Sequence, residues 1–250
     1  MEFFLYILIG FAAQMIDGTM GMAYGVSCRS FLRAAAGLPP AVASAVVHCA
    51  EIPISLISGI SHWKLRNVDR RLLLRLMLPG ALGGVFGAWL LTNIGDTLEP
   101  LIDVYLVVMG IIILFKALRQ RQPRPRQAGA YVYPLGFCGG FLDAVGGGGW
   151  GPVVTSTMVA TGHDVKKTIG TVNMAEFLVT VAQTTAFAVL MVEFTQYLYI
   201  IGGLLIGGML AAPLAASLCK KLPLRPLMVL IGCLIVILNL YNLLAWTGRL

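Results

Sequence analysis

Apolar residues gather into long runs along the chain, and short polar segments separate these runs. The most continuous runs cover residues 72–91, 101–118, 177–192, 197–218 and 227–246. A helix needs about 20 apolar residues to cross the ~30 Å hydrocarbon layer of a membrane. Charged residues make up 12% of the chain, about half of the roughly 25% typical of soluble domains. The pattern therefore predicts an all-α polytopic membrane protein.

The same pattern of residues occurs twice in the chain. The segment "GFAAQMIDGTMGMAYG" begins at residue 10 and "GFCGGFLDAVGGGGWG" at residue 136, which is an offset of 126. The helix that follows carries "VVHCAE" in the first half and "TVNMAE" in the second, and it pairs His48 with Asn173 and Glu51 with Glu176. We interpret these matches as an internal duplication, because lipid penalises the acidic residues that both copies keep. The repeats are residues 1–118 and 130–250, and a basic, proline-bearing linker, residues 119–129, joins them on the cytoplasmic side.

Loop charge predicts how the two repeats are oriented. Basic segments, which favour the cytoplasmic side of a membrane, occur at residues 61–71, 119–129, 163–167 and 220–225, whereas residues 92–99 and 191–196 are acidic or neutral. All four basic segments share one side if each repeat begins with a hairpin of two half-helices that enters the membrane and returns. The prediction is two inverted repeats, each a broken, re-entrant hairpin followed by three transmembrane helices. Eight plain spans with parallel repeats are the alternative, and Arg29 and Arg33, which fall on or near the outer side, are exceptions to the charge pattern.

Glycine-rich segments interrupt the first element of each repeat. Unpaired backbone at membrane depth is tolerated only inside protein or beside a wet cavity, so four consecutive glycines indicate a designed break. A helix that restarts after a break presents free N–H groups and a partial positive charge, which bind anions. We therefore expect an anion site between the two breaks. Its expected substrate-binding residues are Met20, Gly21, Met22, Ala23, Tyr24, Gly25, His48, Gly146, Gly147, Gly148, Gly149, Trp150, Gly151 and Asn173.

Ionisable residues inside apolar segments are functional candidates by default. Glu51 and Glu176 are expected to couple transport to protons, because burial favours the neutral form of a carboxyl group, which can donate to an oxyanion and later release its proton. Asp17 and Asp143 stand just ahead of the breaks, and we expect them to hold the backbone there. Arg29 is either a cation facing the substrate or an outer-surface residue. His62 and His163 are expected at the surface.

Several other functions are not supported by the sequence. The net charge of +7 arises from short loops, so it reflects membrane topology and gives no reason to expect nucleic acid as a partner. "GGGGWG" lacks a preceding strand and a Gly-Lys-Ser/Thr ending, which argues against a nucleotide site. The five cysteines follow no metal or disulfide spacing, and no cofactor is expected. The first segment lacks a basic leading region and a cleavage site, so we expect it to stay in the mature protein.

The paired signatures resemble those of the TauE/SafE sulfite exporter family. The residues that carry the resemblance are "GFCGGFLDAVGGGGWGP", "DGTMGMAYG" and "ASAVVHCAEIPISLISGISHW" followed by "NVD", and the similarity covers nearly the whole chain. It implies transport of a small sulfur oxyanion, such as sulfite or an organosulfonate, across the bacterial cytoplasmic membrane. The first signature departs from the second, with Met22 and Ala23 in place of glycines and Val26 in place of Pro152, so the two halves of the site are chemically unequal.

The function we expect is a multi-pass secondary transporter of such an anion in the lipid bilayer, with alternating access around a midplane site. The alternative is a cation or metal permease that uses His48, Glu51 and methionine side chains as ligands. A membrane-embedded enzyme or scaffold is less favoured, because no nucleophile is paired with a base. A homodimer is left open by the sequence.

Overall fold

A computed structural model describes residues 2–118, 129–190, 194–218 and 224–246, and all regular elements within them are helices. The first half contains α1 (Glu2–Met20), α2 (Tyr24–Ala36), α3 (Pro40–Lys64), α4 (Arg70–Ile94) and α5 (Glu99–Leu118). The second half contains α6 (Val132–Gly146), the π-helix η1 (Gly151–Thr155), α7 (Ser156–Ala160), α8 (Val165–Leu190), the 3-10 helix η2 (Phe194–Tyr197), α9 (Leu198–Leu218) and α10 (Leu224–Trp246). The predicted linker lies outside the described residues except for Gly129.

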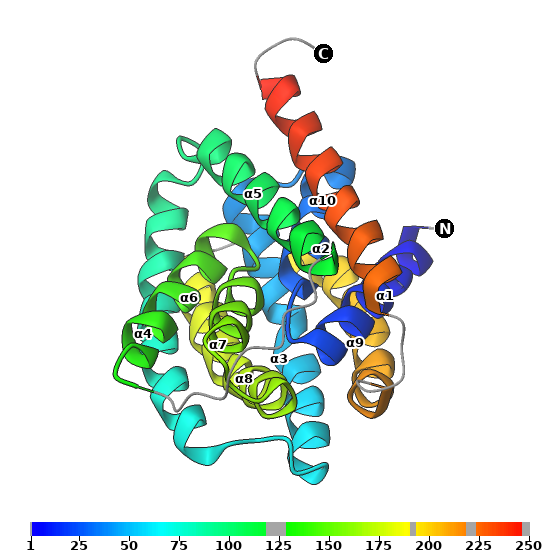
Figure 1. Cartoon of the computed structure of the whole chain (residues 1–250). Helices are drawn as coiled ribbons and strands as arrows, with labels where there is room; N and C mark the ends of the chain where they lie inside the picture. The colour runs from blue at the N-terminus through cyan, green and yellow to red at the C-terminus, as the bar shows by residue number, and fades with distance from the viewer. Residues whose placement is uncertain (1, 119–128, 191–193, 219–223, 247–250) are drawn as a thin grey trace.

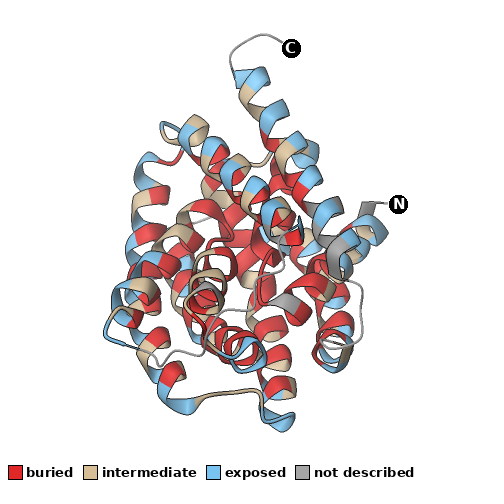
Figure 2. Ribbon diagram, viewed as in Figure 1, coloured by how far each residue is buried: buried red, intermediate tan, exposed pale blue. Residues whose placement is uncertain are grey.

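The outer surface of the bundle is apolar and its interior is unusually polar. Figure 2 shows which parts of each helix are buried and which are exposed. Large apolar side chains such as Leu78, Leu82 and Phe115 face outward, whereas acidic, basic and amide side chains are buried. Within the described residues, four helices are long and apolar enough to span a membrane, namely residues 40–64, 70–94, 165–190 and 195–218. The chain is therefore a multi-pass α-helical membrane protein.

Local sequence explains where several helices begin and end. The Asp69 carboxylate caps α4, because its Oδ1 accepts from the N–H groups of Arg71 (2.9 Å) and Leu72 (3.2 Å). Pro40 occupies the first turn of α3, a position that needs no N–H donor. Gly37 ends α2 in the left-handed conformation. With 13 residues, α2 is too short to cross the ~30 Å hydrocarbon layer alone.

The first helix of each half packs on a helix of the other half. In Figure 1, α1 lies with α9 on one side of the bundle and α6 lies with α4 on the other. Glycines make both contacts close: Gly207 lies on the backbone of α1 at Ile7 and Phe11, and Gly83 lies on the backbone of α6 at Phe137. In each half, therefore, a glycine of one repeat lets the first helix of the other repeat approach closely.

Equivalent helices of the two halves run antiparallel where they meet. On the facing sides of α3 and α8, Ser58 contacts Asn173, whereas His48, earlier in α3, stacks on Phe187, later in α8. The contact of α5 with α10 has the same sense, because Gly110 lies against Val236 and Gly232 against Leu114. These directions are expected of halves related by a two-fold axis. The inverted orientation of the repeats in a membrane stays a prediction.

The basic loop between α3 and α4 and the beginning of α8 lie at the same end of the bundle. Asp69 N–H donates to the hydroxyl of Thr171 (2.8 Å), and Asn67 packs on Gly170. Two of the predicted cytoplasmic segments, residues 61–71 and 163–167, are thereby neighbours, as the loop-charge prediction requires.

Candidate functional site

The first helix of each half stops where the glycine-rich segment begins. α1 ends at Met20 before α2 begins at Tyr24, and α6 ends at Gly146 before η1 begins at Gly151. Gly21 and Gly147 hold the same left-handed conformation, with φ of 66° and 64°. A Cβ atom disfavours that conformation, so glycine lets both chains turn out of the helix at equivalent points. Both predicted breaks are therefore present.

The two breaks lie directly against each other. Gly25 packs on the backbone of Gly147 and Gly148, and, in the reverse sense, Gly151 packs on the backbone of Gly21. A Cβ atom on Gly25 would lie 2.8 Å from Cα of Gly148, a distance that real Cβ atoms essentially never show. Thr155 adds a hydrogen bond across the contact, since its hydroxyl donates to the Gly21 carbonyl (2.6 Å).

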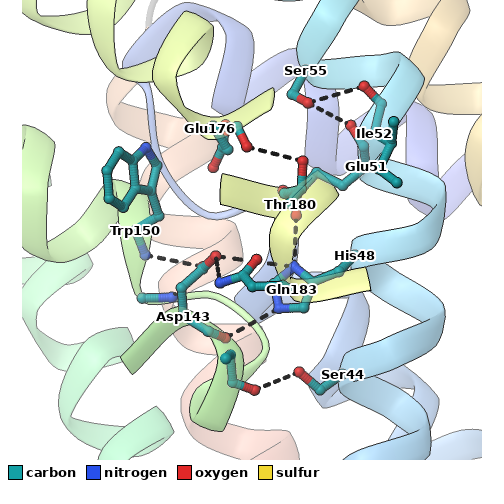
Figure 3. Close-up of polar contacts among 12 residues, drawn as sticks. Ser44, His48, Glu51, Ile52, Ser55, Asp143, Trp150, Glu176, Thr180 and Gln183 are labelled. Carbon is teal, nitrogen blue, oxygen red and sulfur yellow. Dashed lines mark hydrogen bonds and ion pairs between the residues drawn. The ribbon is translucent and has the colours of Figure 1, made fainter. Parts of the chain in front are cut away.

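The aspartates ahead of the breaks bind the backbone that follows them. Asp143 Oδ1 accepts from the N–H groups of Gly149 (2.8 Å) and Trp150 (3.0 Å), and the Asp17 carboxyl group accepts from the equivalent N–H of Tyr24. Figure 3 shows Asp143 in this position. An internal carboxylate therefore already occupies the amides of Gly149 and Trp150, which the sequence had suggested for a bound anion.

His48 connects the broken segment to α3. Its Nε2 lies 3.2 Å from the carbonyl oxygen of Asp143, and its Nδ1 lies 3.1 Å from Oε2 of Glu51 (Figure 3). Gln183 of α8 donates from Nε2 to Oδ2 of Asp143 (2.9 Å). Helices α3, α6 and α8 thus meet at one buried polar cluster, and Gln183 is a member that sequence reasoning missed.

Asn173 occupies the position in α8 that His48 occupies in α3. It donates to the Ile169 carbonyl (3.0 Å) and accepts from the Ser58 hydroxyl (2.6 Å), and it lies beside Gly21. Glu176, one turn further, is buried within electrostatic reach of Asp17, Glu51 and Asp143. The predicted coupling and break residues therefore gather in one region, and the signal that identified them was their shared spacing in the two repeats.

The remaining predicted site residues form the walls of the breaks. Met22, Ala23 and Tyr24 are buried, and the side chain of Met20 lies outside the described residues. Trp150 is fully buried, donates from Nε1 to the Val172 carbonyl (3.1 Å) and packs on Gly80. Trp150 therefore lies inside the bundle and not at its surface.

Three basic residues expected at or near the surface are buried. The imidazole of His62 is fully buried and its Nε2 lies 3.0 Å from the Gly18 carbonyl, because α3 packs on the end of α1. Arg33 pairs with Glu99 and, at 3.3 Å, with Asp103.

Arg29 is fully buried, so its interpretation as an outer-surface residue is wrong. Its NH1 donates to the Val145 carbonyl (2.6 Å). His163 is half-buried, and its Nε2 lies 2.7 Å from the Tyr131 hydroxyl.

Within the described ranges, no three His, Cys, Asp or Glu side chains are grouped as metal ligands. His48 and Glu51, the residues assigned to a metal in the permease alternative, contact each other, and His48 also contacts the break at Asp143.

The chain is similar to known membrane proteins over most of its length. Residues 6–242 match the family model "Sulfite exporter TauE/SafE". The chain is also similar to "Probable membrane transporter protein YtnM" of Bacillus subtilis (strain 168), with 39% identity over 243 residues that cover 94% of this chain and 80% of the relative. No solved structure matches the chain. With the duplicated signatures, the two breaks and a family match over almost its whole length, the chain belongs to the TauE/SafE sulfite exporter family.

Proposed function

We propose that this protein is a secondary transporter of a small sulfur oxyanion, either sulfite or an organosulfonate, in the bacterial cytoplasmic membrane. The coarser assignment, to a family of membrane transporters, rests on the family match and on the relative's name. The observation that carries the finer proposal is the reciprocal contact of the two helix breaks in the buried centre of the bundle. Non-helical backbone at this depth is expected only where it is buried in protein or lines a path for solute.

The arrangement of the helices supports alternating access to one central site. Halves related by a two-fold axis present similar surfaces to the two sides of a membrane, so a small rearrangement can exchange which side is open. The sequence contains no nucleotide-binding motif, so the proposed energy source is an ion gradient or the gradient of the anion itself.

Uptake into liposomes tests this proposal. The purified full chain is reconstituted, and uptake of [35S]sulfite, of a labelled organosulfonate such as taurine, and of a divalent metal ion is measured in parallel. We expect saturable uptake of at least one sulfur anion above protein-free liposomes. Metal uptake without sulfur-anion uptake would support the cation permease instead, and an absence of flux for all three would exclude the transporter proposal for these substrates.

The contact between His48 and Glu51 suggests how protons are coupled to transport. The Asp143 carbonyl can only accept, so Nε2 of His48 must carry the proton of that bond. The Nδ1···Oε2 contact then needs one more proton, either on the imidazole or on the carboxyl group. We therefore assign a transferable proton to this contact, with Asp17, Asp143 and Glu176 as the acidic groups around it.

Replacement of Glu51 tests the coupling. Glu51→Gln keeps the size of the side chain but removes its titratable carboxyl group, so the pH dependence of uptake should flatten relative to the parent. Asp164→Asn is the matched control, because Asp164 is an exposed carboxylate just before α8. Its Oδ1 accepts a hydrogen bond from the N–H of Lys167 in the first turn of that helix. Asparagine has the same Oδ1 atom, so this bond can remain while the charge is lost. A pH profile of Glu51→Gln that coincides with those of the parent and the control would remove Glu51 from the coupling mechanism.

A further inference from the structure

Arg29 is a buried cation with unused hydrogen-bonding capacity. It is 0% exposed in α2, and only its NH1 has a hydrogen-bond partner, the Val145 carbonyl at 2.6 Å. Its Nε and NH2 atoms are buried without a partner. The ion pairs of the described residues include none to Arg29; Asp103 and Glu99 act on it only from beyond ion-pair distance, and both are paired with Arg33. A buried charge is costly unless it is paired, so this guanidinium calls for an anionic partner.

The pseudo-symmetric position shows that the contact with the opposite break does not require a charge. Thr155 stands where Arg29 stands in the first half, again by an offset of 126 residues. Its hydroxyl donates to the Gly21 carbonyl of the opposite break, as Arg29 donates to the Val145 carbonyl. A single hydroxyl donor is enough for that role. The charge and the remaining N–H groups of Arg29 are therefore in excess of what the contact between the halves needs.

A second unpartnered donor lies against the same glycine segment. The side-chain carbons of Arg29 pack on Gly147, and the ring of Tyr105 from α5 packs on Gly146 while its hydroxyl faces Gly149. The Tyr105 hydroxyl oxygen is buried without a hydrogen-bond partner. A guanidinium and a phenol hydroxyl beside this buried glycine backbone form a donor set that suits a small oxyanion.

We propose that Arg29 and Tyr105 form an oxyanion-binding site at the second break, between α2, α5 and the glycines 146–149. This inference rests on the proposed function, and it assigns the substrate to one side of the pseudo-symmetric centre. The guanidinium binds two oxygens of one sulfite-like group through Nε and NH2, the planar fork that suits a bidentate oxyanion. Asp143 keeps the amides of Gly149 and Trp150, so the anion binds beside this carboxylate and does not replace it.

A pocket at the end of α2 is lined by Arg33, which lies one helical turn from Arg29. This pocket has a volume of about 440 Å³, and its lining includes Arg33, Asp96, Glu99, Asn242 and Trp246. Arg33 follows Arg29 by four residues, so the two guanidinium groups lie on one face of α2. An anion that enters from this pocket would therefore meet Arg33, with its partners Glu99 and Asp103, before it meets Arg29.

Substitution of Arg29 tests the site in the full chain. In Arg29→Gln a shorter, neutral amide replaces the guanidinium, so both the charge and the NH1 bond to the Val145 carbonyl are lost. Hydrogen bonds to a charged group contribute enough that the half-saturation concentration for sulfite uptake should rise about tenfold to a hundredfold, with a smaller rise in Arg29→Lys. Arg71→Gln removes an exposed arginine at the start of α4 and should leave half-saturation within about twofold of the parent. A value for Arg29→Gln equally close to the parent would overturn the proposal.

A measurement on the parent protein decides the question if Arg29→Gln does not fold. Selenite is the probe, because it has the shape of sulfite and a stronger scattering atom, and its position is determined by electron cryo-microscopy of the reconstituted full chain. Density within hydrogen-bonding distance of the Arg29 guanidinium supports the site, whereas density elsewhere, or none at saturating selenite, overturns it.

If the parent takes up neither sulfite nor taurine, the proposed transport function fails, and the selenite position still decides on the anion site. If uptake occurs without Arg29 density, only the Arg29 site fails.

Discussion

Replacement of Gly25 by alanine measures how closely the two breaks must approach. The added Cβ would contact the Gly147 carbonyl and lie 2.8 Å from Cα of Gly148. Both are backbone atoms of a segment packed on its other sides, so neither can move away alone. Overpacking of this kind costs about 3 kcal/mol, and the better helix propensity of alanine returns about 1 kcal/mol. We therefore expect a net loss of about 2 kcal/mol.

The assay measures the thermal midpoint (Tm) of the detergent-solubilised full chain. The quantity recorded at each temperature is the fraction of protein that remains monodisperse after heating. A loss of about 2 kcal/mol should lower Tm by roughly 4–8 °C for a chain of this size. Gly202→Ala is the matched control, because a Cβ at Gly202 of α9 would meet only Phe3, at 3.8 Å. This control should be neutral or gain about 0.5 kcal/mol. If Gly25→Ala and Gly202→Ala have the same Tm, the breaks do not touch as described and the reasoning about the central site is refuted.

Two further substitutions probe the same region. Ala23 has φ of 91°, a left-handed conformation that costs an alanine about 1–2 kcal/mol, so Ala23→Gly should raise Tm by a few degrees; a lower Tm would show that Ala23 is unstrained. Asp143→Asn keeps an oxygen for the amides of Gly149 and Trp150 but turns an N–H donor toward Nε2 of Gln183, which should cost about 1–3 kcal/mol. Adding Gln183→Leu should recover part of that loss, and a double variant less stable than Asp143→Asn alone would contradict this explanation.

The sequence predicted those features that depend on local chemistry or on repetition. Runs of apolar residues indicated the long helices, and the glycines near residues 21 and 147 indicated the breaks, because few other residues accept a left-handed turn there. The pairing of His48 with Asn173 and of Glu51 with Glu176 identified positions that the fold gathers at its centre. In each case the signal was present within one short segment or in its copy.

The sequence could not predict contacts that arise only when distant helices meet. Gln183 reaches Asp143 across 40 residues, and nothing in the polar pattern of α8 distinguishes it from an exposed amide. His62 follows a loop rich in charge, yet α1 covers it. Arg29 was left between two interpretations, because helix spacing says which face a residue occupies but not which element covers that face.

The exchange of first helices between the halves limits how the molecule can move. α1 belongs to the first repeat by sequence but is seated on α9, and α6 belongs to the second but is seated on α4, with Gly207 and Gly83 leaving no gap at either seam. Neither repeat can rotate as a rigid body unless its first helix loses its packing contact with the opposite repeat. In the proposed transport cycle, each body that moves would therefore combine helices of both repeats, and its hinges would not lie at the boundary between the repeats.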